Sequence, residues 1–93
     1  MAEPQRFRKK PVEIEAVQLT NDPHEAARIA AWCGGVALAS PGRVSLHIET
    51  LEGTMVAHPS DWIIREPFPT EDRKFYPCKP DIFAATYEAV DRG

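Results

Sequence analysis

The sequence predicts an α+β domain: a small, bent antiparallel sheet or partial barrel of about five or six short strands, with one helix after the first strand and another at the C-terminal end. Three observations lead to this prediction. Apolar and polar residues alternate over 12–16 and 43–49, which is typical of strands with one buried face. Apolar residues recur at helical spacing over 26–33. Turn sequences rich in proline and glycine separate these segments.

The first strand is predicted to begin after Pro11, because proline favours extended geometry in the residue before it. Val12, Ile14 and Ala16 then alternate with two glutamates. The apolar phase shifts at Val17, so we expect either a bulge near Ala16 or a strand end buried on both sides.

The first helix is predicted to start at Asp22, whose side chain suits the N-cap, with Pro23 at the first helical position. The apolar residues of the following segment share one helical face: Ala26, Ile29, Ala30 and Cys33. Two glycines, Gly34 and Gly35, provide the left-handed stop.

The segment 43–66 predicts a three-stranded antiparallel meander, because three apolar stretches are separated there by two short turn sequences, 52–53 and 58–61. Just before it, 36–39 is either a short strand or the approach to a turn.

The C-terminal third predicts a polar, proline-containing loop over 67–73 and a short strand over 74–76 that stops at Pro77. Asp81 is predicted to cap the final helix. The apolar face of that helix consists of Ile82, Phe83, Thr86, Tyr87 and Val90.

Length and composition indicate one domain over 1–93, with 1–6 as a flexible arm. A chain this short buries little surface, so a homodimer is a possible means of adding stability. The two cysteines are 45 positions apart and form no disulfide framework, which favours a reduced, cytoplasmic setting. No apolar run is long enough for membrane insertion, and no signal peptide is expected.

Candidate catalytic and metal-ligating residues are few. The three histidines have no zinc-site spacing, and no glycine-rich phosphate loop precedes a helix, so we expect no metal and no cofactor. Cys33 is interpreted as a core residue, whereas Cys78 precedes a helix whose N-terminus could lower a thiol pKa. No general base accompanies Cys78, and we expect no enzymatic activity.

Two segments are candidates for partner binding. Phe68 stands between Pro67 and Pro69, and an exposed aromatic in a rigid loop can anchor a protein contact; the alternative is that it folds back onto its own sheet. The N-terminal arm carries four basic residues without an intervening acid: Arg6, Arg8, Lys9 and Lys10. They could contact phosphates, but the formal net charge is −3 and no nucleic-acid-binding motif is present, so nucleic acid is not the expected partner.

Four segments carry a family resemblance: FRKKPVEIEAVQ at 7–18, IETLEGTM at 48–55, SDWIIRE at 60–66 and FYPCKPDIFAATYE at 75–88. Together they resemble a family of small phage and prophage proteins of uncharacterised function. The chain departs from the family pattern at Ser60, where the family usually has glycine; we expect Asp61 to tolerate the resulting turn.

The resemblance implies a phage-encoded protein in the cytoplasm of a bacterial host. With no catalytic set present, the expected function is binding to a host protein, which is inhibited or redirected during infection. Two alternatives stay open. One is an oligomeric protein that sequesters a small ligand or nucleotide against host defence; the other is weak nucleic-acid binding through the basic arm.

Overall fold

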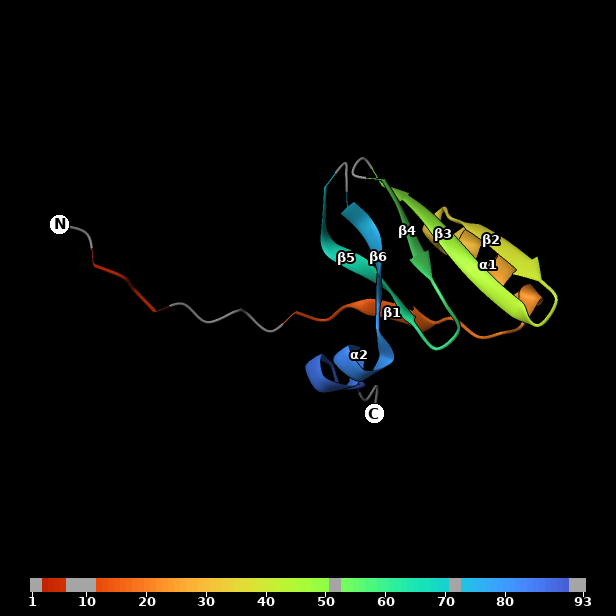
Figure 1. Ribbon diagram of the computed structural model, residues 1–93. Helices are drawn as coiled ribbons and strands as arrows, with labels where there is room; N and C mark the ends of the chain where they lie inside the picture. Colours follow the sequence, from red (N-terminus) through yellow and green to blue (C-terminus); the bar gives the residue numbers. More distant parts are fainter. Residues whose placement is uncertain (1–2, 7–11, 51–52, 71–72, 91–93) are drawn as a thin grey trace.

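The computed structural model describes residues 3–6, 12–50, 53–70 and 73–90, and it confirms the predicted α+β class (Figure 1). Within these residues there are two helices and six strands. They follow the chain in the order β1 (Glu15–Gln18), α1 (Pro23–Cys33), β2 (Val36–Ser40), β3 (Arg43–Thr50), β4 (Gly53–Ala57), β5 (Trp62–Thr70), β6 (Arg73–Cys78) and α2 (Pro80–Thr86).

The strands form two antiparallel sheets that do not close into a barrel. The terminal sheet has the order β1-β5-β6, and the central sheet has the order β2-β3-β4. The predicted meander over 43–66 is therefore wrong in its last strand, because β5 pairs with β1 and β6 rather than with β4.

The turn before β5 explains why that strand leaves the central sheet. Ser60 donates its N–H to the Leu19 carbonyl at 2.8 Å, and Leu19 donates its own N–H to the Asp61 carbonyl at 2.8 Å. These two bonds tie the turn to the end of β1. Ser60 has a φ of 85°, so Ser60, rather than Asp61, takes the left-handed conformation of this turn.

β1 is shorter than predicted, since the residues 12–14 precede the paired segment. Its register with β5 is continuous from Glu15 opposite Arg65 to Gln18 opposite Trp62, so there is no bulge at Ala16. Ala16 and Val17 are both half-buried, as expected for the other option, a strand end with cover on both sides.

The observed ends of α1 confirm the predicted helix boundaries. Asp22 accepts a hydrogen bond from the His24 N–H at 2.9 Å, Pro23 begins the helix, and Gly34 ends it with a φ of 72°. The helix covers one face of β2 and β3 (Figure 1). Gly35 is also needed, because a Cβ there would lie 2.8 Å from the His47 carbonyl oxygen.

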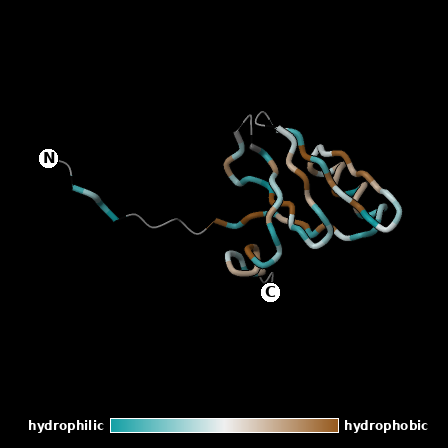
Figure 2. The backbone as a smooth tube through the Cα atoms, viewed as in Figure 1, coloured by the Kyte–Doolittle hydropathy of each residue, from teal (hydrophilic) through white to brown (hydrophobic). Residues whose placement is uncertain are grey.

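One aliphatic core joins the two sheets and α1. It comprises Leu19, Ala26, Ile29, Ala30, Cys33, Val44, Leu46, Ile48, Ala57 and Ile63. Aromatic residues lie at the margin of this core: Phe75 is half-buried against it, and Trp62 stacks on Phe83 with ring centroids 4.1 Å apart. Figure 2 shows the apolar segments gathered in this body, whereas 3–6 are hydrophilic.

Four C-terminal predictions are wrong. The segment 67–70 continues β5 instead of forming a loop, and β6 runs through Pro77 to Cys78. Proline is tolerated there because β6 is the last strand of its sheet. α2 begins at Pro80 with Lys79 as N-cap, so Asp81 lies in the first turn without capping, and the helix ends at Thr86 before Val90.

Candidate protein-contact surface

The second half of β5 presents an aromatic side chain to solvent. Phe68 is 71% exposed, and Pro67 and Pro69 beside it are also exposed. The pairing of β5 with β6 shifts register between Arg65 and Thr70, so this stretch is irregular. Neither proline has an N–H for a sheet hydrogen bond, which accounts for the interruption.

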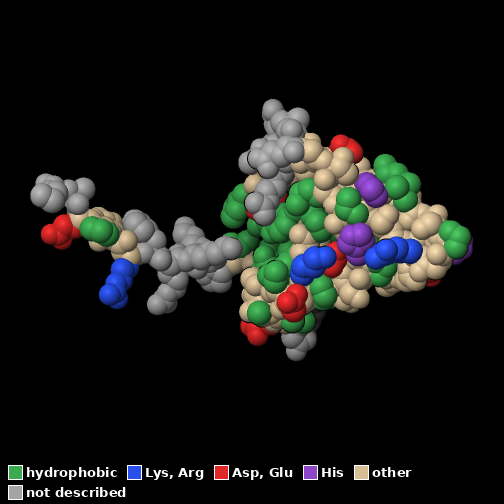
Figure 3. Space-filling view, in the orientation of Figure 1, with side chains coloured by type: hydrophobic (Ala, Val, Ile, Leu, Met, Phe, Trp, Pro, Cys, Tyr) green, Lys and Arg blue, Asp and Glu red, His purple; other side chains and the backbone are tan. Residues whose placement is uncertain are grey.

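A groove of about 380 Å³ adjoins Phe68. The pairing of β1 with β5 ends at Glu15 and Arg65. The groove lies beyond that pair, between the segment that precedes β1 and the second half of β5. One wall is formed by Val12, Glu13, Ile14 and Glu15, and the other by Arg65, Glu66, Pro67, Phe68 and Pro69. Figure 3 shows hydrophobic side chains gathered at this end of the body, over β5 and β6.

The lining of this groove mixes apolar side chains with carboxylates. The lining contains three glutamates and one guanidinium group, that of Arg65. Its Nη1 atom lies 3.2 Å from Glu15 Oε2, and both side chains are largely exposed, so the pair contributes at most about 1 kcal/mol. The groove is suited to an apolar side chain that is accompanied by a positive charge.

The structure brings together only some of the residues that the sequence marks for partner binding. Pro67, Phe68 and Pro69 line the groove together. Arg6 is exposed, and 3–6 lie apart from the body in Figure 1. The other three basic residues, Arg8, Lys9 and Lys10, fall outside the described residues.

Sequence reasoning missed one entire wall of the groove. The alternation over 12–16 assigns those residues to a strand, but nothing local indicates that Val12 and Ile14 lie across from Phe68.

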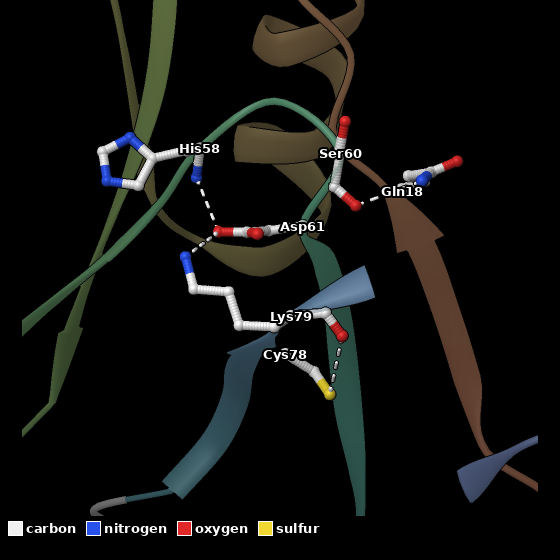
Figure 4. A network of polar contacts seen from close by, with 6 residues as sticks. All are labelled: Gln18, His58, Ser60, Asp61, Cys78 and Lys79. Atoms are coloured by element: carbon white, nitrogen blue, oxygen red, sulfur yellow. Dashed lines mark hydrogen bonds and ion pairs between the residues drawn. The ribbon is translucent and has the colours of Figure 1, made fainter. Parts of the chain in front are cut away.

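A second cluster surrounds Asp61, the one buried charged residue in the described part of the chain, with a side chain that is 6% exposed (Figure 4). Its Oδ2 atom accepts a hydrogen bond from the His58 N–H at 2.9 Å and lies 3.4 Å from Lys79 Nζ. Gln18 donates its side-chain amide to the Ser60 carbonyl at 3.1 Å. The cluster thereby connects β1, the turn before β5 and the start of α2.

A cysteine and a histidine lie near Asp61, but their contacts stabilise the fold and do not form a catalytic arrangement. Asp61 bonds the backbone of His58, and the imidazole points away from the carboxylate (Figure 4). The Cys78 thiol donates to the Lys79 carbonyl at 3.6 Å. Burial raises the pKa of the Cys78 thiol, and the carboxylates of Asp61 and Asp81 raise it further. The predicted lowering by the helix N-terminus is therefore wrong in direction.

The remaining chemistry-bearing residues are dispersed. Cys33 is buried, and burial raises the pKa of its thiol. His47 lies on the outer face of β3, with Nε2 3.4 Å from Ser45 Oγ. In the described part of the chain, no three histidine, cysteine or acidic side chains come together as a metal site. Neither described helix has the length and apolarity to cross a bilayer.

No family model, curated protein sequence or solved structure matches the chain.

Proposed function

We propose that this chain is a non-enzymatic binding protein that contacts another protein through Phe68 and the adjoining groove. The partner is a host protein in the bacterial cytoplasm, whose activity is inhibited or redirected during phage infection. The host setting rests on the resemblance of the four sequence segments to phage and prophage proteins. The choice of contact surface rests on the exposure of Phe68 and on the groove beside it.

The observation that carries the proposal is the exposure of Phe68 on a constrained strand. A solvated phenylalanine is unfavourable by roughly 2 kcal/mol relative to a buried one. The prolines on either side restrict the backbone, and the pairing of β5 with β1 and β6 holds both ends of the segment. Little conformational entropy is then lost when Phe68 enters a pocket on a partner.

The groove indicates which chemistry the partner presents. Val12, Ile14 and the two prolines offer apolar contact, and the glutamates favour a lysine or arginine at the rim of the partner surface. The same carboxylates repel phosphate, so the geometry favours a protein over a nucleotide.

The proposal is tested by affinity capture from host lysate with three immobilised proteins: the wild type, Phe68→Ala and Ile82→Ala. Ile82 is a matched control, since it is an apolar side chain that is 55% exposed but lies on α2. We expect one dominant protein to bind the wild type and Ile82→Ala in equimolar amount, and to bind Phe68→Ala at least tenfold more weakly, about 1.4 kcal/mol.

A purified candidate partner is then titrated by calorimetry against the same three proteins. Equal affinity for wild type and Phe68→Ala would overturn the assignment of the surface, and the absence of any captured protein would overturn the proposed class of function. Thermal unfolding of each variant confirms that the fold is retained.

A further inference from the structure

β2 is an edge strand with an open side. It pairs with β3 along Val36–Ser40, and no described strand pairs with its other edge. Figure 1 shows β2 at the margin of the central sheet, away from β5. The other edge of that sheet differs, because β4 lies against β6.

The sequence of β2, Val-Ala-Leu-Ala-Ser, lacks the usual protection of a free edge. It contains no charged residue and no proline, which are the common means by which edge strands avoid pairing with other chains. Two of its apolar side chains are well exposed, Val36 at 56% and Leu38 at 49%. By contrast, the edges of the terminal sheet include Glu15 in β1 and Pro77 in β6.

The register shows which backbone groups face the open side. Val44, opposite Ala39, donates its N–H to Asn21 Oδ1 at 3.0 Å and so does not donate it to β2. The pair of Ala39 and Val44 is therefore of the kind that does not exchange backbone hydrogen bonds. Since such pairs alternate along a ladder, the polar backbone groups of both Ala37 and Ala39 point to the open edge.

We propose that β2 pairs in antiparallel fashion with β2 of a second copy of this chain, which joins the two central sheets into one sheet of six strands. The twofold axis passes beside Leu38. Ala37 of one copy then exchanges hydrogen bonds with Ala39 of the other, and the reverse pair does the same. The open N–H and C=O groups of both alanines in each strand are satisfied by this single register.

The side chains of β2 also favour pairing with a second copy of this chain. At the axis, the two Leu38 side chains are directly opposite in a pair of the closer kind, with Cα atoms about 4.5 Å apart. Val36 of each copy lies next to this pair on the same face, so four exposed apolar side chains merge into one cluster. Because β2 is uncharged, the self-pairing meets no repulsion between like charges.

This dimer is expected to be reversible. Pairing over five residues buries less than the roughly 1,600 Å² of a standard interface, so a dissociation constant in the micromolar range is expected. The groove is lined in part by β5 residues, and β5 lies on the other side of the body from β2 (Figure 1), so the groove stays accessible and would make the dimer bivalent toward a partner.

The experiment is sedimentation velocity over a concentration series of the full chain. We expect the mass to rise from the monomer value of 10.4 kDa toward twice that value. Leu38→Lys and Leu38→Glu each place two like charges at the axis, and each is expected to raise the dissociation constant at least tenfold. An equimolar mixture of the two is expected to regain dimer as a heterodimer, because the charges are then opposite.

Val56→Lys is the matched control. Val56 is exposed on the same face of the central sheet, opposite His47, but it belongs to β4 and is far from the axis. This variant is expected to dimerise like the wild type. A wild type that stays monomeric throughout the series would overturn the proposal, and so would a mixture of the two Leu38 variants that forms no heterodimer.

Discussion

At the scale of single residues, Ser60 carries a backbone conformation that suits glycine better. Its φ of 85° costs an L-residue roughly 1–2 kcal/mol, whereas glycine adds about 0.5–1 kcal/mol of entropy to the unfolded state. We therefore expect Ser60→Gly to raise the free energy of unfolding by about 0.5–1 kcal/mol in urea denaturation. Gly42→Ala is the reverse control: its new Cβ would meet no atom within 4 Å, and its φ of 76° alone should lower stability by about 1 kcal/mol.

Asp61 illustrates the difference between a buried acceptor and an exposed ion pair. Asp61→Ala leaves the His58 N–H without its partner and removes a buried carboxylate, so we expect a loss of about 2 kcal/mol. Lys79→Ala removes only the exposed side of the pair and should cost less than about 1 kcal/mol. Chemical denaturation distinguishes them, and equal losses would show that the ion pair, rather than the turn, is the stabilising contact.

The thiols of Cys33 and Cys78 are expected to make the free energy of unfolding depend on pH. Burial raises the pKa of Cys33 and of Cys78 above the ordinary value of 9.0, so the unfolded state releases these protons first. The stability they contribute is complete below pH 9 and is lost as pH rises through the higher folded-state values. We expect the free energy of unfolding to fall above about pH 9, and to fall less steeply in Cys33→Ala. Parallel slopes in the two proteins would contradict this assignment.

At the scale of elements, α2 is attached by aromatic contacts rather than by a buried face. No residue of α2 is buried, and Phe83 lies between the stacked ring of Trp62 and the ring of Tyr87, 5.0 Å away. Phe83→Ala should cost about 2 kcal/mol and should release the α2 amides to rapid hydrogen exchange. Ile82→Ala, on the exposed side, should leave exchange unchanged. Retained protection in Phe83→Ala would mean that other contacts hold the helix.

Element types were predictable where the signal is local. The ends of α1 follow from Asp22, Pro23 and Gly34, because capping depends on neighbouring residues only. The end of β5 was not predictable in this way. The prolines at 67 and 69 indicate a loop by composition, but at that position the strand is irregular in its pairing and accepts residues without an N–H.

At the scale of the whole molecule, one core should make the two sheets unfold together. Leu46 of the central sheet and Ile63 of the terminal sheet are fully buried in the same cluster. We expect Leu46→Ala and Ile63→Ala each to cost about 3 kcal/mol and to shift a single transition. Tryptophan fluorescence and far-UV circular dichroism should give the same midpoint in each variant. Separate midpoints would indicate that the sheets are independent folding units.

The candidate surface was predictable in one half only. Phe68 stands out in the sequence because it is a large apolar residue between two prolines in a polar segment. Its side chain is exposed in the structure, which a contact with a partner requires. The opposite wall, with Val12 and Ile14, is some fifty positions away in the chain. Its proximity depends on the pairing of β1 with β5.

The sequence by itself determined the class of fold, the boundaries of α1 and the position of Phe68 between two prolines, because periodicity, capping and turn chemistry act over a few residues. The tertiary structure alone decided which strands are partners, where the groove lies and which edge stays open. The apolar pattern of β5 suits either sheet, and the bonds between Leu19 and the turn at Ser60 and Asp61 select the terminal one. Pairing between distant strands is settled by the best joint burial of all elements, which no local segment encodes.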